Sequence, residues 1–214
     1  MNQRQAGLMR YPDTVILVFA KAPVAGKVNT RLIPDLGLAA ATCLQDELLH
    51  HRLSTLADAC LCDVVLYCAP STDHVVFETC REHYQVRLAA QQGEGLGQRL
   101  LHGVDEAFRQ YQHVILLGTD APALEVIQIE QAITELHSGK DVVIVPAEDG
   151  GYVLAGVSGV HEQLFQDISW GTDQVMRQTL ERISSMGLDH SVLESSWDID
   201  RYEDYLRYRK QFGR

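Results

Sequence analysis

Apolar and polar residues follow two distinct patterns along this chain. Apolar runs of five to seven residues recur from residue 14 onward, and between them apolar residues return every three or four positions. Short runs indicate buried β-strands, and the longer periodic stretches indicate amphipathic helices. The runs predict strands at 14–20, 63–69, 86–90, 113–119, 141–147 and 152–156. The periodic stretches predict helices at 37–60, 71–84, 96–111, 124–139, 172–187 and 201–212.

The order of these elements predicts their arrangement. Strands that alternate with helices indicate an α/β fold, in which helices cover both faces of a mostly parallel sheet. The EDGG stretch between the last two predicted strands is typical of a tight bend. In such sheets, ligands bind beyond the carboxyl ends of the strands. The site is therefore expected in the loops at 21–32, 91–97, 119–123 and 147–151.

The length and the first residues indicate the domain organisation. A chain of 214 residues is long enough for one domain with a sizeable core. Residues 1–13 are polar and lack the apolar stretch of a signal peptide. We therefore expect a short flexible tail at 1–13 and a single domain at 14–214.

Charge and composition exclude several classes of partner. The net charge of −11, from 18 basic and 29 acidic residues, argues against binding to nucleic acid or to an anionic membrane. No apolar run approaches the ~20 residues of a membrane span. The five cysteines are odd in number and lack zinc-site spacing, which favours free thiols in a reducing cytoplasm. The nine histidines show no ligand-spaced cluster in the sequence.

The stretch after the first predicted strand, KAPVAGKVNTRL, is a candidate anion-binding loop. A P-loop needs Gly, four residues, Gly-Lys and then Ser or Thr. Here Lys21 takes the place of the first Gly and Val28 that of the hydroxyl residue, which argues against a P-loop NTPase. Gly26 and its small neighbours allow backbone N–H groups to approach an anion beside Lys27 and Arg31. The alternative is a solvated basic loop without a ligand.

The stretch QQGEGLGQRL is rich in glycine and also precedes a predicted helix. A dinucleotide fingerprint would continue Gly93 and Gly95 with a glycine three residues later, but that residue is Gln98. NAD binding is therefore not expected. Two interpretations stay open, a flexible turn or a turn that opens onto a nucleotide with Gly97 and Arg99 beside it.

Two aspartates are candidate metal ligands. Asp120 directly follows the most apolar predicted strand, where a carboxylate can hold a hard cation such as Mg²⁺ or Mn²⁺. A helix cap is the alternative, but Asp120 lies early for a helix that begins near Leu124. Asp200 and Glu203 form an Asp-x-x-Glu pair that predicts a cap for the last helix. Asp198 has no such capping role and is the better second metal ligand.

The remaining candidates lie near helix starts and glycines. Asp149 precedes Gly150 and Gly151, which suits equally a hairpin turn or a close approach to a ligand. The start of the helix at 172–187 predicts Thr172 or Asp173 as its N-cap, and the helix at 71–84 suggests Ser71 as a cap. No nucleophile motif is present, so the expected chemistry is electrostatic rather than covalent.

Five motifs in order resemble one known family. FAKAPVAGKVNTRL, GTDAPAL, PAEDGGYVLAG, SWGTDQV and WDIDRYEDY are similar to those of bacterial glycosyltransferases of the GT-A type, a family related to the guanylyltransferases of molybdopterin and deazaflavin cofactor synthesis. The resemblance covers about residues 14–206. It implies the nucleotide-diphospho-sugar transferase fold, a three-layer α/β/α sandwich with a mixed sheet.

The resemblance also implies roles for the candidate residues. The loop with Lys21, Lys27 and Arg31 looks like the nucleotide and pyrophosphate loop, and the Asp120 segment looks like the metal-binding segment. This chain departs from the family with Asn29 in place of Lys and Gly95 in place of an acidic residue. Ala121 likewise stands where Cys is common.

Three functions therefore stay open. The first is a metal-dependent glycosyltransferase that moves a sugar from a nucleotide-sugar to a small acceptor. The second is a nucleotidyltransferase that joins a nucleoside triphosphate to a phosphorylated small molecule. The third is a nucleotide-binding protein without catalysis, which the residues Asn29 and Gly95 suggest. Where transfer needs a general base, Asp149 is preferred over Asp173, because the glycine pair beside it leaves room for an acceptor.

Overall fold

A seven-stranded sheet forms the centre of the molecule. The computed structural model describes residues 9–213, and its strand order is β3-β2-β1-β4-β6-β5-β7. The strands are β1 (Thr14–Lys21), β2 (Asp63–Ala69), β3 (Arg87–Ala90), β4 (His113–Leu117), β5 (Val142–Pro146), β6 (Tyr152–Val157) and β7 (His190–Val192). Only β6 runs antiparallel to its two neighbours. The sheet is therefore mixed and mostly parallel, which confirms the predicted class.

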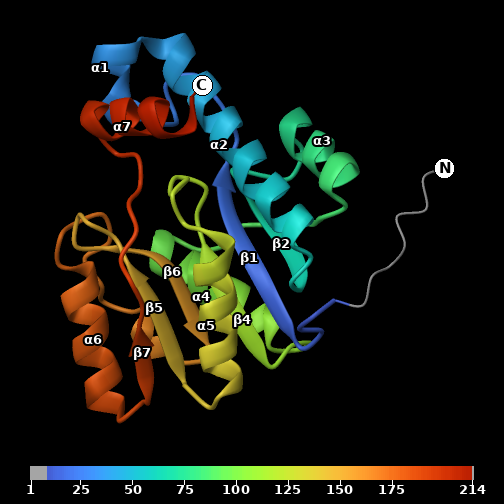
Figure 1. Cartoon of the computed structure of the whole chain (residues 1–214), viewed down its shortest axis with the longest axis vertical. Helices are drawn as coiled ribbons and strands as arrows, with labels where there is room; N and C mark the ends of the chain where they lie inside the picture. Colours follow the sequence, from blue (N-terminus) through green and yellow to red (C-terminus); the bar gives the residue numbers. More distant parts are fainter. Residues whose placement is uncertain (1–8, 214) are drawn as a thin grey trace.

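Helices cover both faces of this sheet (Figure 1). They are α1 (Ile33–Leu36), α2 (Leu38–Ala59), α3 (Val75–Tyr84), α4 (Leu96–Ala107), α5 (Val126–His137), α6 (Val175–Met186) and α7 (Tyr202–Phe212), with short 3-10 helices η1 (Thr30–Leu32) and η2 (Glu162–Leu164). The core on one face joins the sheet to α2, α3 and α5. The core on the other face joins it to α4 and α6. The fold is the predicted three-layer α/β/α sandwich.

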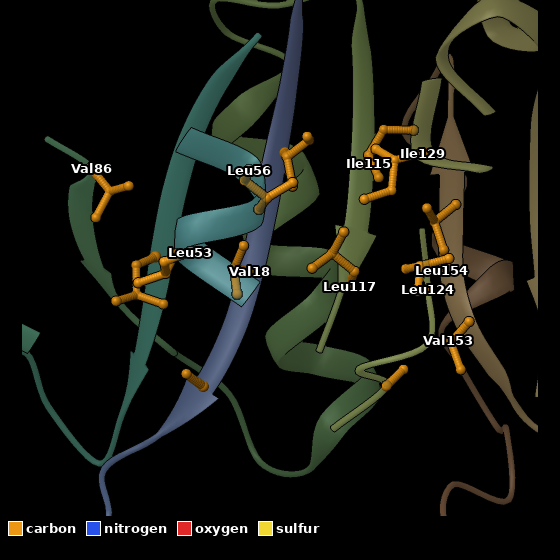
Figure 2. Packing of buried hydrophobic residues seen from close by; sticks show 14 of the residues in the cluster. Val18, Leu53, Leu56, Val86, Ile115, Leu117, Leu124, Ile129, Val153 and Leu154 are labelled. Atoms are coloured by element: carbon orange, nitrogen blue, oxygen red, sulfur yellow. The ribbon is translucent and has the colours of Figure 1, made fainter. Parts of the chain in front are cut away.

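The first strand shows why its sequence is apolar throughout. Successive side chains of a strand point to opposite faces, so a strand between two helical layers buries all of them. Val18 packs in the same cluster as Leu53 and Leu56 of α2 (Figure 2). Val15 and Leu17 belong to the cluster on the other face.

A third, smaller core lies beside the carboxyl end of β1. It joins η1 and α2 to the last segment of the chain and consists of Leu32, Leu44, Leu48, Trp197, Ile199 and Tyr208. Figure 1 shows α7 lying against α1 and the start of α2. This packing brings residues 196–200 close to the loop after β1, although about 170 residues of sequence separate them.

Several predicted helix boundaries are wrong. The second helix begins at Val75, with His74 as N-cap, rather than at residue 71. Ser71 Oγ instead accepts a hydrogen bond from the N–H of Asp73, so it closes a turn before the helix. α4 ends at Ala107, where residue 111 was expected, because a turn follows it. The elements α1, β7 and the two 3-10 helices are too short to give a periodic pattern and were not predicted.

The residues just before β1 are anchored to the fold. Residues 1–8 of the predicted tail lie outside the described residues. The N–H of Tyr11 donates to Leu61 O at 2.9 Å, and the N–H of Gln112 donates to Asp13 O at 2.8 Å. These hydrogen bonds hold residues 11–13 against the fold, so the expected flexible tail does not extend as far as β1. Within residues 9–213, no helix is long and apolar enough to cross a membrane.

Candidate functional site

A cleft of about 640 Å³ opens at the carboxyl ends of β1 and β4. All four loops in which the site is expected contribute residues to its lining. Tyr152, Val153 and residues 170–172 and 198–200 complete the walls. The position agrees with the general place of ligands in open α/β sheets.

Most of the predicted site residues meet in this cleft. Its lining includes Lys21, Arg31, Arg99, Asp120, Asp149, Gly151 and Asp198. Four other candidates are not part of the lining, namely Gly26, Lys27, Gly97 and Gly150. The geometry thus groups the two predicted metal ligands, the predicted base and three cations. The roles assigned to all these residues stay predictions.

The acidic side of the cleft is built by two segments that hold each other in place. The N–H of Ile199 donates to Asp120 O at 2.8 Å, which fixes Asp198 and Asp200 beside the end of β4. Asp120 does not cap α5, whose N-cap is Glu125. The capping alternative for Asp120 is therefore excluded.

Burial and like charges raise the pKa of two of these carboxyl groups. Burial, together with the nearby charges of Asp120 and Asp149, raises the pKa of Asp198 to about 7. The pKa of Asp120 is also raised, first by loss of hydration at the cleft floor, although Arg52 opposes the shift. The Asp120 side chain still faces the open cleft. A divalent cation would relieve this like-charge repulsion.

The cleft carboxylates could supply part of the ligand shell of a divalent cation. Asp120 and Asp198 are hard oxygen donors, as Mg²⁺ and Mn²⁺ prefer. Within residues 9–213, however, the cleft carboxylates do not form a group of three ligand atoms within 4.8 Å of one another. Magnesium sites of this kind usually take one or two carboxylates and complete their shell with substrate phosphates and water.

Asp200 has a different role from the predicted helix cap. Arg31 Nη1 donates to both carboxylate oxygens of Asp200, at 2.7 and 2.6 Å. In the first turn of α7, Oδ2 of Asp204 accepts from the N–H groups of Asp200 and Arg201. The N-cap of α7 is thus Arg201, its N–H is bonded by Asp204 from the third helical position, and Asp200 is left to hold Arg31 at the cleft edge.

The basic side of the cleft is weaker in charge than the acidic side. Lys21 forms no ion pair with any residue of the described chain, and Arg99 donates through Nε to Gly93 O at 3.2 Å. Four aspartates and three basic residues line the cleft. Because this balance is negative, a polyphosphate would bind better together with a cation than alone.

The loop after β5 holds Asp149 in a defined position. Its Oδ1 accepts from the N–H of Gly151 at 2.9 Å, and its side chain is exposed to the cleft. Gly150 has φ +92°, and a Cβ there would lie 2.5 Å from the carbonyl oxygen of Asp173. Gly150 therefore permits close contact between the bend and the segment before α6. Neither predicted cap of α6 is correct, because its N-cap is Gln174.

Gly97 has a packing contact rather than a place in the cleft wall. It lies in the first turn of α4, where a Cβ would be 2.2 Å from Phe165 O and 2.6 Å from Trp170 Nε1. The missing side chain lets α4 approach the loop at 165–170. This contact positions Trp170, which does line the cleft.

Arg52 is a residue of this site that the sequence did not reveal. It lies in α2, is 1% exposed, and donates from Nη2 to Ala121 O and from Nη1 to Leu124 O. Burial lowers the pKa of Arg52 to about 10. Its two hydrogen bonds fix the turn that follows Asp120. The available signal was an arginine on the apolar face of α2, between Leu48 and Leu56.

The raised pKa of Asp198 predicts a pH-dependent stability. The pKa of Asp198 is raised in the folded state, so its contribution to stability is fully present below the unfolded pKa of about 3.9 and is lost as the pH rises from there through about 7. We expect Asp198→Asn to match the melting temperature of the metal-free wild type at about pH 4, near the unfolded pKa. At pH 8 the variant should melt at a higher temperature than the wild type. Calorimetry in a metal chelator measures this, and a constant difference across pH would contradict it.

The fold and the cleft define a transferase with the nucleotide-diphospho-sugar transferase fold. Residues 52–172 match the family described as "Uncharacterized protein conserved in bacteria (DUF2064)", and the chain belongs to this family. A protein from Desulfovibrio desulfuricans G20, provisionally named a nucleotide-diphospho-sugar transferase, is 31% identical. The match covers 93% of this chain and 87% of that one, with a TM-score of 0.84.

More distant structures share the fold alone. A nucleotidyl transferase from Methanothermobacter is 19% identical with a TM-score of 0.60, over 96% of this chain and 98% of that one. A 4-diphosphocytidyl-2C-methyl-D-erythritol synthase from Anaerococcus prevotii is 12% identical with a TM-score of 0.62, over 95% and 99%. No curated protein has a significantly similar sequence.

Proposed function

We propose that this protein is a metal-dependent glycosyltransferase, which moves a sugar from a nucleotide-diphosphate sugar to a small acceptor. One observation carries the proposal: a single cleft is lined both by Asp120 and Asp198 and by Lys21 and Arg99. A nucleotide diphosphate with a bound cation complements this distribution of charge. The 31% identical protein from Desulfovibrio, with its provisional name, supports the same function.

Different residues of the cleft bind the diphosphate and stabilise its charge. Lys21 and Arg99 bind the diphosphate, and Asp200 holds Arg31 ready beside them. Asp120 and Asp198 would hold Mg²⁺ or Mn²⁺, which when bound neutralises charge on the departing diphosphate. The aromatic pair Tyr152 and Trp170, with ring centroids 6.1 Å apart, offers an apolar wall to a base or a sugar ring.

Asp149 is the proposed general base. In the transfer, the bond between the anomeric carbon and the diphosphate oxygen breaks, and the diphosphate keeps the electron pair. The acceptor oxygen forms the new bond to that carbon and gives its proton to Asp149. Because Gly151 holds Oδ1 at 2.9 Å, the other carboxylate oxygen is left to accept this proton.

Two residues, Asn29 and Gly95, favour the alternative of a nucleotide-binding protein without catalysis. Asn29 adopts a left-handed conformation with φ 47°, and its Nδ2 donates to Ala41 O at 3.0 Å. Asparagine tolerates this conformation better than most residues, so its side chain supports the loop and brings no positive charge. Gly95 precedes α4 with φ 85°, a conformation that favours glycine. Both departures remove charge from the cleft edge, which fits the reading as a binding protein without catalysis.

A thermal-shift panel tests the proposal. The metal-free protein is melted with UDP, GDP, ADP, CDP, TDP and the matching triphosphates, each with and without Mn²⁺ or Mg²⁺. A ligand at 100 times its Kd stabilises by about 2.7 kcal/mol, which for this size raises the melting temperature by roughly 5–10 °C. We expect a shift with one diphosphate that requires the metal, and release of that diphosphate from its sugar conjugate.

Other outcomes of the panel separate the alternatives. A shift only with a triphosphate, together with pyrophosphate release, would replace the proposal by nucleotidyl transfer. Metal-dependent binding without turnover over a broad panel of donors and acceptors would favour a protein that binds nucleotides without catalysis. No shift with any nucleotide would overturn the nucleotide site itself.

A further inference from the structure

Three candidate metal ligands converge at the opposite end of the sheet from the cleft. Asp13 directly precedes β1, His113 is the first residue of β4, and His137 is the last residue of α5. One potential ligand atom from each lies within 4.8 Å of the others. The nine histidines have no ligand spacing in the sequence, and these three ligands are distant in sequence, so only the fold brings them together.

The backbone holds two of these residues in fixed positions. Thr14 is the register partner of His113 in the parallel pair of β1 and β4. Asp13 O also accepts hydrogen bonds from the N–H groups of Gln112 and His113, at 2.8 and 3.2 Å. The starts of the two strands therefore present Asp13 and His113 side by side without any ligand.

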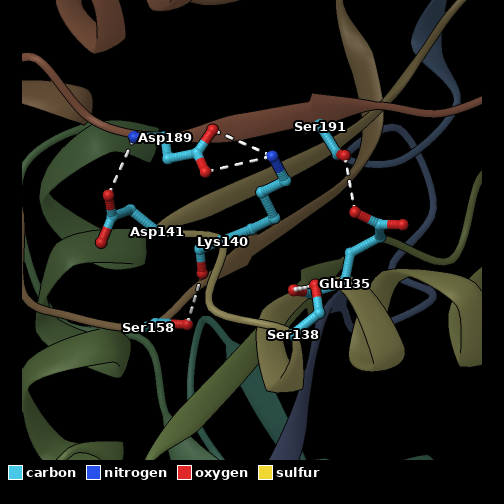
Figure 3. Close-up of polar contacts among 7 residues, drawn as sticks. All are labelled: Glu135, Ser138, Lys140, Asp141, Ser158, Asp189 and Ser191. Carbon is cyan, nitrogen blue, oxygen red and sulfur yellow. Dashed lines mark hydrogen bonds and ion pairs between the residues drawn. The ribbon is translucent and has the colours of Figure 1, made fainter.

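The hydrogen bonds of His113 determine which of its nitrogens is available. Ser158 Oγ donates its only hydrogen to Lys140 O at 2.9 Å (Figure 3). The contact of 2.9 Å between Ser158 Oγ and His113 Nδ1 must then have the ring nitrogen as donor. In the neutral ring, Nε2 is left with its lone pair. A fixed tautomer of this kind is typical of metal-binding histidines.

His137 and Asp13 complete the donor set. His137 Nε2 lies 3.4 Å from Asp13 Oδ1 and 3.0 Å from Thr14 Oγ1. The His137 and His113 rings are 4.5 Å apart between centroids. Asp13 Oδ1 is buried and accepts no hydrogen bond from any residue between 9 and 213. His137 ends a helix, where the backbone dipole favours positive charge.

We propose that Asp13, His113 and His137 bind one divalent transition-metal ion, of which Zn²⁺ is the type case. Two imidazoles and one carboxylate suit zinc and its neighbours in the transition series better than Mg²⁺ or Ca²⁺. Three protein ligands leave a fourth position to water. The ion links the starts of β1 and β4 to the end of α5, so it stabilises the fold at a distance from the cleft.

The alternative explanation of this cluster is an ion pair between protonated His137 and Asp13, without a metal. His113 Nδ1 donates to Ser158 Oγ, so the neutral His113 ring keeps the lone pair of Nε2. Two facing imidazoles can share a cation but disfavour a second proton. The ion pair accounts for the 3.4 Å contact, but it gives no role to Nε2 of His113.

Titration of the metal-free full-length protein with Zn²⁺ by calorimetry tests the proposal. Co²⁺ serves as a second probe, because its visible absorption reports the ligand set. Each titration is repeated with Asp120→Asn, so that binding by the cleft is separated from binding here. We expect one equivalent of Zn²⁺ that survives Asp120→Asn. His137→Gln and Asp13→Asn should each weaken binding by at least about tenfold.

A second helix-end histidine provides the matched control. His83 lies in the last turn of α3, is exposed, and belongs to no ligand group in the described chain, so His83→Gln should bind Zn²⁺ like the wild type. Circular dichroism confirms that each variant is folded, and exposed His137 is the least disruptive of the three to replace. Unchanged Zn²⁺ affinity in both His137→Gln and Asp13→Asn would overturn the proposal. So would a thiolate absorption band with Co²⁺, which would assign the ion to cysteine.

Discussion

Replacement of Asp120 by asparagine is expected to weaken metal-dependent binding of the nucleoside diphosphate by on the order of 10²–10³-fold. Asparagine keeps the shape of the side chain but removes the charge that would hold the cation. Turnover should fall by at least the same factor, because the departing diphosphate loses its counter-charge. The measurement is calorimetric titration with the diphosphate identified in the thermal-shift panel, with and without Mn²⁺.

The same variant should not lose stability. The pKa of Asp120 is raised in the folded protein, so the charged carboxylate is disfavoured in the cleft and a neutral residue relieves that repulsion. Asp105→Asn is the matched control, since Asp105 is an exposed residue of α4 that pairs only at the surface with Arg109. Equal metal-dependent affinity in Asp120→Asn and Asp105→Asn would show that Asp120 holds no cation.

The layers of the fold follow from the sequence because burial on two faces leaves a strong pattern. The run from Thr14 to Ala20 must be apolar on both sides, and the structure places it at the centre of the sheet. Short elements leave no such pattern. The three-residue strand β7 and the 3-10 helices depend on tertiary contacts, which local propensity does not encode.

Part of the candidate site could be predicted from the sequence, because it too leaves a local pattern. A charged residue directly after an apolar strand, such as Asp120, is conspicuous, and the topology of parallel strands then gives its location. Capping was misjudged at Asp200, because the choice between Asp200 and Asp204 depends on where Arg31 lies after folding. The contact of Gly97 with Phe165 joins residues far apart in sequence, and no local motif records it.

Arg52 shows most clearly what the sequence pattern conceals, and it gives the second large expected effect. Its guanidinium bonds two buried carbonyls in the turn after Asp120, those of Ala121 and Leu124. Arg52→Met fills similar space but removes both hydrogen bonds, at about 1–3 kcal/mol for each lost bond. Leu124 O then lacks the arginine donor, and Ala121 O keeps only the 3.2 Å bond from the N–H of Leu124. Relief of the buried charge offsets part of this, so we expect a net loss of about 2–4 kcal/mol in the free energy of unfolding.

Binding should suffer as well, even where the variant is fully folded. Without its two hydrogen bonds the turn no longer fixes the carboxylate of Asp120, and a displacement near 1 Å at such a site costs on the order of 10²-fold. Chemical denaturation gives the stability, and titration with the diphosphate and Mn²⁺ gives the affinity. Arg52→Lys keeps the charge but not the two-pronged geometry, so it should fall between the wild type and Arg52→Met. Arg81→Met, at an exposed surface pair on α3, is the control and should change neither quantity. Loss of stability with full metal-dependent affinity would mean that Arg52 supports only the fold and not the position of Asp120.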